Sequence, residues 1–369
     1  MRSEAAILWG IGEPWSVEEI ELDEPKGREV LVRLVASGMC HSDEHIVTGD
    51  LPGVLPMVGG HEGAGVVEAI GPDVTFVQPG DHVVFSFVPS CGTCPSCAAG
   101  HSNLCDQGAV LMAGLQLDGT ARHHARGQDL RTMCLLGTFA RHTVVHEWSV
   151  VPVPAEVPLD KACLVGCGVP TGWGSAVYAA DVRPGDFVAI VGCGGVGSAA
   201  IQGARLAGAD RIIAVDPVES KREAAQGFGA THTAASLTEA MPVVQRETYG
   251  RGCDKVICTM GVGRGELMGD VMALVAKRGR CVVTNLHPWF EPTNTVPMIQ
   301  LTLYEKQVVG SIFGSANPRR DIPRLLELYA NGHVDLDGMI TRTYPLEQVN
   351  QGYDDLREGR NIRGVLLFD

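Results

Sequence analysis

The sequence is short of basic residues and has no long apolar run, and these two shortages exclude several classes of protein. Its 369 residues include 29 Lys and Arg against 43 Asp and Glu, so the formal net charge is -14. Because no long basic run offsets this acidity, we do not expect a nucleic-acid surface. The N-terminal segment MRSEAAILWG has no apolar stretch long enough for a signal peptide or a membrane span. Internal repeats and low-complexity segments are also absent.

The remaining composition is that of a globular protein with about two domains. Hydrophobic residues make up 45% of the chain and charged residues 20%. Twelve cysteines without a secretory signal favour a reducing, cytoplasmic location, where thiols serve metal binding and packing rather than disulfides.

The pattern of apolar runs changes along the chain. Up to residue 168, short strand-like runs at 30–35, 65–70 and 81–85 alternate with Gly- and Pro-containing turns, which predicts a barrel-like antiparallel domain. Between 169 and 312, strand-like and helix-like runs alternate, which predicts βαβ units around a parallel sheet. The expected strands of that sheet cover 187–192, 211–215, 255–258, 280–284 and 307–312. The last stretch begins with a helix predicted over 322–331 and ends with a strand over 364–368.

Four cysteines form the most specific local motif, CGTCPSCAAGHSNLC. The spacing of Cys91, Cys94, Cys97 and Cys105 lets four thiolates converge on one tetrahedral ion. A site filled by four cysteines leaves no open coordination position, so we expect a structural zinc here. Four unrelated thiols in one loop are the alternative, and two successive C-x-x-C steps make that alternative weak.

A glycine-rich turn in the second region has the setting of a dinucleotide-binding loop. The motif GCGGVG follows the apolar run 188–191 and opens a helical pattern over 198–207. Gly192 would permit the tight turn, Gly194 would let the backbone approach a pyrophosphate, and Gly197 would let helix and strand pack closely. The alternative is a turn that is merely rich in glycine.

The next strand ends in Asp216, near the distance expected for a residue that holds the adenosine ribose. Its carboxylate would bind both ribose hydroxyls and repel a 2′-phosphate, so the sequence favours NAD over NADP. Lys221 lies near enough to flank the same ribose, although a solvated helix lysine explains it nearly as well.

A second set of metal ligands must be assembled from distant positions. Cys40, His61 and Cys167 supply two sulfurs and one imidazole and leave a fourth position open, as in a catalytic zinc site. Taken singly, a buried free cysteine or a structural histidine would explain each of them.

The segments that flank these residues resemble the zinc-dependent medium-chain alcohol dehydrogenases over essentially the whole chain. The resemblance is carried by GMCHSDEH, GGHEGAGVV, the four-cysteine motif, GCGVPTGWGS, GCGGVGS and NIRGVLLF. Within that family, LLGTFA, VGCGVP and EQVNQGY are most similar to the actinobacterial nicotinoprotein alcohol dehydrogenases. Those enzymes are assayed with N,N-dimethyl-4-nitrosoaniline (NDMA) and hold NAD tightly.

The resemblance implies a fold, a ligand set and a cofactor. It implies a GroES-like catalytic domain over 1–168 and 313–369, and a Rossmann domain with a doubly wound parallel sheet over 169–312. Two zinc ions per chain and NAD(H) follow from the same comparison. A homo-oligomer, a dimer built through the nucleotide domains, is the expected assembly.

The resemblance also assigns roles to single residues. Ser42 matches the hydroxyl that bonds the reacting alcohol, and His45 matches the histidine that ends the proton relay. Asp43 and Glu62 match carboxylates behind the catalytic zinc, although a plain structural hydrogen bond would explain both. The residues expected to bind the cofactor are His41, Thr171, Gly192, Gly194, Gly195, Val196, Gly197, Asp216, Lys221 and Arg363, with His41 and Arg363 at the pyrophosphate.

Apolar positions indicate part of a substrate pocket. Leu51 and Phe87 match pocket residues of relatives, with Phe87 on the same strand run as Phe85. Trp173, Trp289 and Phe290 are further candidates, and packing is the stronger explanation for all three.

The expected reaction is oxidation of an alcohol to an aldehyde or ketone, and its reverse, with hydride transfer to NAD. The cofactor is expected to stay bound and to be reoxidised in place by a small acceptor. A formaldehyde dehydrogenase that uses a thiol such as mycothiol is an alternative. The glutathione-dependent branch is disfavoured because Ala109 stands where that branch has Arg. A zinc- and NAD-binding regulatory protein is a further, weaker alternative, because no ligand or relay residue is missing.

Overall fold

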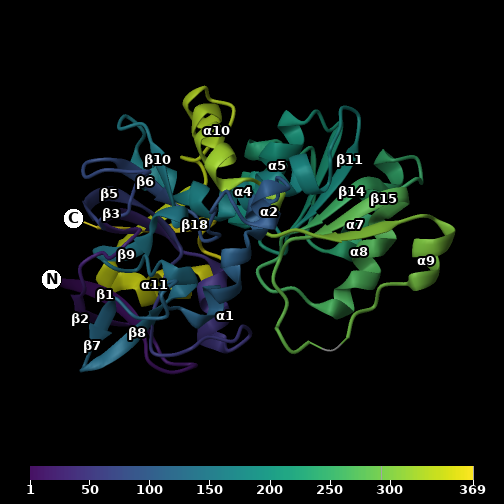
Figure 1. Ribbon diagram of the computed structural model, residues 1–369. Helices are drawn as coiled ribbons and strands as arrows, with labels where there is room; N and C mark the ends of the chain where they lie inside the picture. Colours follow the sequence, from purple (N-terminus) through teal and green to yellow (C-terminus); the bar gives the residue numbers. More distant parts are fainter. Residues whose placement is uncertain (292, 369) are drawn as a thin grey trace. The chain divides into compact units, whose positions relative to one another are not determined.

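A computed structural model describes residues 1–291 and 293–368, and these form two compact units (Figure 1). Unit 1 comprises Met1–Cys167, Asn317–Gly332 and the chain from Leu336 onward, whereas unit 2 comprises Gly168–Ala316 and His333–Asp335. The sequence placed its domain boundaries at 168/169 and 312/313, and it assigned 333–335 to the first domain. Within the described residues, no helix is long and apolar enough to cross a membrane.

The first sheet of unit 1 is a small closed barrel. Its strands, in spatial order, are β1 (Arg2–Leu8), β2 (Ser16–Leu22), β7 (His123–Ala125), β8 (Gln128–Thr132) and β4 (Met57–Val58). Alternation along β1 explains how the barrel packs, because Ala5 and Ile7 join one apolar cluster while Ala6 and Leu8 join another.

The second sheet of unit 1 is larger and mixed. Its path is β10 (Val150–Val153), β6 (His82–Phe85), β5 (Glu62–Ile70), β3 (Glu29–Gly38), β18 (Arg363–Leu367) and β17 (Ile340–Pro345), with β9 (His142–His146) also paired to β3. All pairs are antiparallel except β17 with β18. The C-terminal strand therefore pairs with β3, which brings Arg363 to the end of β3 at Gly38 and to the start of β5. The expected barrel-like domain is thus a small barrel together with a separate mixed sheet.

Short helices complete unit 1. They are α1 (His41–Thr48), α2 (Pro95–Ala98), α3 (Leu159–Ala162), α10 (Pro318–Ala330) and α11 (Val349–Arg357). Helix α10 begins four residues before the predicted start because Asn317 caps it and Pro318 occupies its first turn. Short 3-10 segments in the two units cover Ser102–Leu104, Asp106–Ala113, Met133–Leu135, Glu147–Ser149, Cys163–Gly166, Gly265–Leu267, Phe313–Ser315 and Leu346–Gln348.

Unit 2 is a parallel six-stranded sheet with helices packed along it, as the sequence predicted (Figure 1). Its spatial order is β13 (His232–Ala234), β12 (Arg211–Val215), β11 (Phe187–Val191), β14 (Cys253–Cys258), β15 (Val275–Val283) and β16 (Gln307–Gly310). From the centre of the sheet, β11 to β13 extend toward one edge and β14 to β16 extend toward the other. The carboxyl ends of the two central strands, β11 and β14, therefore form a topological switch point, where doubly wound sheets bind ligands.

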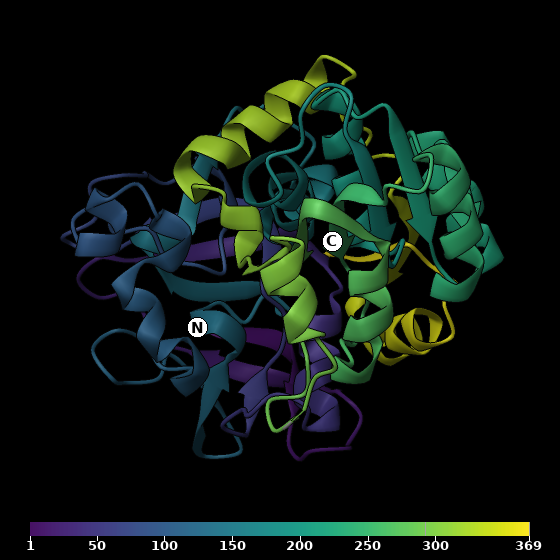
Figure 2. The same cartoon turned by 90° about the vertical axis from the view of Figure 1, so that its right-hand side faces the viewer.

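The helices of unit 2 are α4 (Gly168–Gly174), α5 (Gly195–Leu206), α6 (Glu219–Phe228), α7 (Leu237–Glu247), α8 (Met268–Leu274) and α9 (Met298–Leu303), with a π-helical turn over Ser175–Ala179. Helix α5 packs on β11 and β12, whereas α8 packs on β14 and β15. Residues 284–291 and 293–297, between β15 and α9, form neither helix nor strand, and α9 is light green in Figure 2.

Candidate functional site

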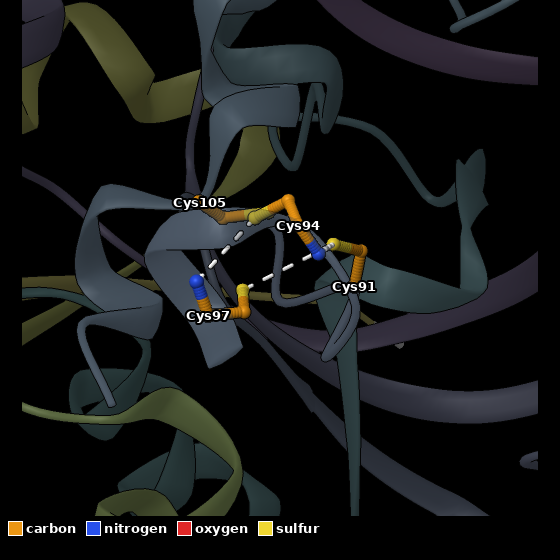
Figure 3. A group of neighbouring side chains, drawn as sticks. All are labelled: Cys91, Cys94, Cys97 and Cys105. Atoms are coloured by element: carbon orange, nitrogen blue, oxygen red, sulfur yellow. Dashed lines mark hydrogen bonds between the residues drawn. The ribbon is translucent and has the colours of Figure 1, made fainter. Parts of the chain in front are cut away.

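The four cysteines of the lobe in unit 1 are turned toward one another (Figure 3). Cys91 Sγ lies 4.0 Å from Cys97 Sγ, and Cys94 Sγ lies 3.9 Å from Cys105 Sγ. All four sulfurs lie within 4.8 Å of one another. This donor set fits one tetrahedral zinc ion and leaves no position for a substrate.

Backbone geometry prepares these sulfurs for a metal. Cys94 caps α2 with its sulfur, which accepts a hydrogen bond from the Cys97 amide at 3.4 Å. The Cys94 amide in turn donates to Cys91 Sγ at 3.3 Å. Burial raises the pKa of Cys91, but hydrogen bonds from the Thr93 and Cys94 amides outweigh it and bring that pKa down to about 6. Burial raises the pKa of Cys97 and brings that of Cys105 to about 12, so Cys91 is the sulfur most ready to bind as a thiolate and a metal must displace the other protons.

A second ligand group lies elsewhere in unit 1 and is entirely buried. The ligand atoms of Cys40, His61, Glu62 and Cys167 lie within 4.8 Å of one another. Cys40 caps the N-terminus of α1, and Glu62 is the first residue of β5, directly after His61. The fold therefore brings together the three ligands that the sequence selected and places the Glu62 carboxylate among them.

The two sulfurs of this group differ in how readily they give up a proton. A hydrogen bond from the Cys167 thiol, opposed by burial and helped by the charge of His61, holds the pKa of Cys40 well below its usual value. The same hydrogen bond and burial raise the pKa of Cys167 well above its usual value. Cys40 therefore gives up its proton more readily than Cys167, and a divalent ion bound here would have to replace the Cys167 proton to be held by two thiolates.

The imidazole of His61 has the carboxylate of Asp43 on its Nδ1 side. Asp43 Oδ2 lies 3.0 Å from Nδ1, and Asp43 Oδ1 accepts a hydrogen bond from the Gly60 amide at 2.8 Å. Burial lowers the pKa of His61, but the charges of Asp43 and Cys40 raise it to a net value well above its usual one. Both ring nitrogens are buried, and neither makes a hydrogen bond of good geometry among the described residues, so the Asp43 contact is an ion-pair distance only. An orphaned, buried nitrogen beside two sulfurs fits a metal ligand.

Arg363 makes a contact that the sequence did not predict. Its guanidinium forms a close ion pair with Glu62, and both side chains are buried. Only a glycine admits this pair, because a Cβ on Gly38 would lie 2.4 Å from Glu62 Oε2 and 2.9 Å from Arg363 Nη2. Burial raises the pKa of Glu62 to about 7 even though the Arg363 charge lowers it. The expected pyrophosphate contact of Arg363 stays a prediction.

Helix α1 carries the two residues expected to handle the proton. Ser42 Oγ lies 3.6 Å from Cys40 Sγ, so the hydroxyl stands beside a candidate metal ligand. His45 is buried, and its Nδ1 lies 3.3 Å from Asp50 Oδ2. Sequence reasoning missed Asp50. The available signal was its position directly after Gly49, where the helix can end and turn back. His41 is the first residue of α1 and is partly exposed.

The apolar candidates for the substrate pocket differ in their burial and contacts. Phe87 packs edge-on against the His61 ring, with centroids 5.8 Å apart, although it follows β6 rather than belonging to it. Leu51 is partly buried against the same core. Trp173 is buried, but Trp289 and Phe290 are 62% and 80% exposed. The packing explanation for those last two is therefore wrong.

Gly192, Gly194 and Gly197 of the turn in unit 2 differ in the space around their α-carbons. Gly192 has φ +98°, and a Cβ there would lie 2.6 Å from the Met260 amide nitrogen. A Cβ on Gly197 would lie 1.9 Å from the Gly192 oxygen, whereas a Cβ on Gly194 would meet nothing within 4 Å. No side chain caps the N-terminus of α5, where Gly195 and Val196 begin the helix. Free amide groups at a helix N-terminus suit a phosphate.

Asp216 directly follows β12, and its carboxylate links the glycine-rich turn to the turn after β12. Its Oδ2 accepts a hydrogen bond from the Cys193 amide at 2.8 Å, and its Oδ1 accepts one from the Val218 amide at 2.9 Å. Each carboxylate oxygen retains a further lone pair, so both can still accept from ribose hydroxyls. Of the other expected cofactor residues, Thr171 is buried in α4 and Lys221 is partly exposed in α6.

Two family models match the chain. Residues 26–155 match the alcohol dehydrogenase GroES-like domain, and residues 195–331 match the zinc-binding dehydrogenases. Both the GroES-like domain and the Rossmann-type sheet expected from the sequence are therefore confirmed.

Full-length relatives agree with these matches. The chain is 51% identical over 370 residues to alcohol dehydrogenase B of Mycobacterium tuberculosis, covering 100% of this chain and 99% of that protein. It is 50% identical over 367 residues to the NDMA-dependent alcohol dehydrogenase of Amycolatopsis methanolica, again covering 100% and 99%. Its fold matches the crystal structure of benzyl alcohol dehydrogenase from Acinetobacter calcoaceticus with a TM-score of 0.93 at 30% identity, covering 100% of each chain. With these matches over its whole length, the chain belongs to the family of zinc-binding, medium-chain alcohol dehydrogenases.

Proposed function

We propose that this protein oxidises an alcohol to an aldehyde or ketone, and catalyses the reverse reaction, by hydride transfer to NAD at a zinc site. The observation that carries the proposal is the buried group of Cys40, His61 and Cys167, with an orphaned imidazole nitrogen and the Ser42 hydroxyl beside it. Two sulfurs and one imidazole are the ligand set of a catalytic zinc with an open position.

We propose two zinc ions per chain, because the two ligand groups share no residue. The four lobe cysteines would hold a structural ion, and Cys40, His61 and Cys167 a catalytic one. Bound zinc would supply Lewis acidity, which lowers the pKa of an alcohol hydroxyl by many units. The Ser42 hydroxyl would then accept the alcohol proton, and His45 would carry it toward water.

The proposed hydride acceptor is NAD rather than NADP. Asp216 supports this choice, because its carboxylate can accept from ribose hydroxyls and would repel a 2′-phosphate. Gly194 and the uncapped start of α5 would receive the pyrophosphate. Bound nicotinamide supplies the redox chemistry, and the protein has to orient it and exclude water.

We further propose that the cofactor stays bound through the catalytic cycle. The support is the 50% identity to an NDMA-dependent enzyme over the whole chain. An enzyme that keeps its cofactor must reoxidise it in place, by a second substrate that takes the hydride back. It would then couple alcohol oxidation to an artificial acceptor without reducing free NAD.

One experiment tests these proposals together. The purified protein is gel-filtered and denatured, and the released NAD(H) is quantified per subunit, with zinc measured on the same sample. A panel of alcohols that includes benzyl alcohol is then assayed with added NAD and, separately, with NDMA. We expect about one nucleotide per subunit. We also expect alcohol oxidation when NDMA is the acceptor and none when free NAD is added in its place. An empty nucleotide fraction with vigorous turnover on added NAD would contradict retention, and a strict need for an added thiol would favour the mycothiol alternative.

Two smaller expectations complete the proposal. Exposed apolar residues on α9, Met298, Ile299 and Leu303, support self-association through unit 2, which light scattering would measure. None of the twelve cysteines in the described residues forms a disulfide. That state fits the reducing environment of the cytoplasm.

A further inference from the structure

The imidazole of His45 contacts a carboxylate that none of the expected roles includes. Asp50 Oδ2 lies 3.3 Å from His45 Nδ1. The same oxygen accepts a hydrogen bond from the Thr48 hydroxyl at 2.9 Å. The Thr48 hydrogen bond therefore holds the Asp50 carboxylate beside the histidine and restricts rotation of the Asp50 side chain.

The end of α1 explains how Asp50 reaches back to His45. Gly49 ends the helix in the left-handed conformation, with φ 78° and ψ 10°, and its amide donates to the Ile46 carbonyl at 3.2 Å. The Leu51 amide then donates to the His45 carbonyl at 3.0 Å. These bonds fold residue 50 against the last helical turn, where its side chain meets the histidine ring.

The two side chains differ in their access to water. The His45 side chain is 2% exposed, whereas the Asp50 side chain is 29% exposed. The imidazole is thus enclosed, and the carboxylate on its Nδ1 side borders the solvent.

We propose that Asp50 is a positioning residue of the proton relay, an inference that rests on the proposed function. Its carboxylate accepts the Nδ1 hydrogen of neutral His45 and so fixes the tautomer in which Nε2 is the proton acceptor. Each alcohol oxidised gives one hydride to the cofactor and one proton to Nε2. The imidazolium formed is paired with Asp50 and then returns the Nε2 proton to water or buffer, which restores the Nδ1-protonated ring.

The tautomer can be measured without any turnover. With ¹⁵N-labelled histidine, long-range ¹H–¹⁵N spectra distinguish Nδ1-protonated from Nε2-protonated rings, and loss of the signal in His45→Gln assigns it. We expect the Nδ1-protonated form in the wild type and a loss of that preference in Asp50→Ala. A wild-type His45 protonated on Nε2 would overturn the proposal. Because this readout needs no substrate, a wrong assignment of the overall reaction leaves it interpretable.

Kinetics provide the second arm. We expect Asp50→Asn to lower kcat with alcohol about ten-fold while KM changes less than two-fold, a modest part of the usual contribution of acid–base catalysis. Added imidazole should restore much of the lost rate, and Asp50→Glu should keep most of it. A purely structural role would show no imidazole rescue. The exposed Asp73→Asn is the matched control for loss of one surface carboxylate. An Asp50→Asn enzyme with unchanged kcat, or with a loss that imidazole does not relieve, would refute the proposal.

Discussion

The carboxylate of Asp43 joins the imidazole of His61 to the turn that precedes it. One oxygen lies 3.0 Å from His61 Nδ1, and the other accepts the Gly60 amide at 2.8 Å. Gly60 itself has φ +86°, and a Cβ there would lie 2.4 Å from the Phe139 ring. The ring of His61 is thereby fixed with Nδ1 toward Asp43, which leaves Nε2 for a metal.

Replacing Asp43 by Asn should weaken metal binding at the catalytic group. The amide keeps the shape but loses the charge that orients His61 and increases its basicity, so we expect roughly 10- to 100-fold lower zinc affinity. Competition with a chromophoric chelator measures this, and zinc in the cysteine lobe serves as the internal reference. Equal affinity of Asp43→Asn and wild type for the more weakly held ion would rule out this role for Asp43.

Replacing Cys94 by Ser should remove one zinc ion and destabilise the protein. The Cys94 sulfur belongs to the lobe and also accepts the amides of Cys97 and Asp106, both at 3.4 Å. Elemental analysis should show about one zinc per chain instead of two, with a lower thermal midpoint. Cys253→Ser, which removes a buried thiol outside both groups, should keep both ions. Unchanged zinc content in Cys94→Ser would contradict the structural site.

The features that the sequence predicted best are those set by local spacing. The cysteine lobe spans fifteen residues from Cys91 to Cys105, and the glycine turn has its strand and helix directly beside it. In both cases the chain needs little tertiary context to bring the groups together.

Features set by distant pairing could not be derived in this way. The Glu62–Arg363 ion pair exists because β18 pairs with β3, across more than 300 residues of sequence. No local pattern predicts that partner. The contact between His45 and Asp50 is local, but it depends on the left-handed turn at Gly49, which places the side chain against the helix it has just left. The start of β14 was missed for a related reason. The sequence predicted a strand from residue 255, but β14 begins at Cys253, because Cys253 pairs with β15 ahead of a register shift between the two strands.

Removing the charge of Asp216 should shift cofactor preference toward NADP. Asp216→Ala would also lose the acceptors for the Cys193 and Val218 amides, which would loosen the turn. Asp216→Asn keeps an acceptor and removes the charge, so it is the sharper variant. We expect the ratio of NADP to NAD affinity to rise about ten-fold, the size of one net hydrogen bond to ribose. Fluorescence titration of cofactor-free protein measures both affinities, and a wild type that prefers NADP would contradict the role of Asp216.

The carboxylate of Asp355 in α11 accepts several hydrogen bonds, and its side chain is 1% exposed. It accepts hydrogen bonds from Tyr344 Oη at 2.7 Å, Arg342 Nη1 at 2.8 Å, Gln351 Nε2 at 3.1 Å and Arg360 Nε at 2.7 Å. The Tyr344 hydrogen bond, opposed by burial and helped by the arginines, lowers the pKa of Asp355 to about 2.

Replacing Asp355 by Asn should therefore cost stability in a pH-dependent way. A carboxyl whose pKa is lower in the folded state stabilises the fold fully above its unfolded pKa of about 3.9, and this contribution disappears as the pH falls toward 2. At pH 7 we expect Asp355→Asn to lower the free energy of unfolding by about 1–3 kcal/mol, because buried donors lose a charged acceptor. The difference from wild type should shrink between pH 4 and pH 2, as measured by urea unfolding at several pH values.

Asp354→Asn is the matched control, since that side chain is 51% exposed and pairs at the surface with Arg357. It should change stability by less than about 1 kcal/mol. A constant difference between Asp355→Asn and wild type across this range would show that the charge of Asp355 contributes nothing.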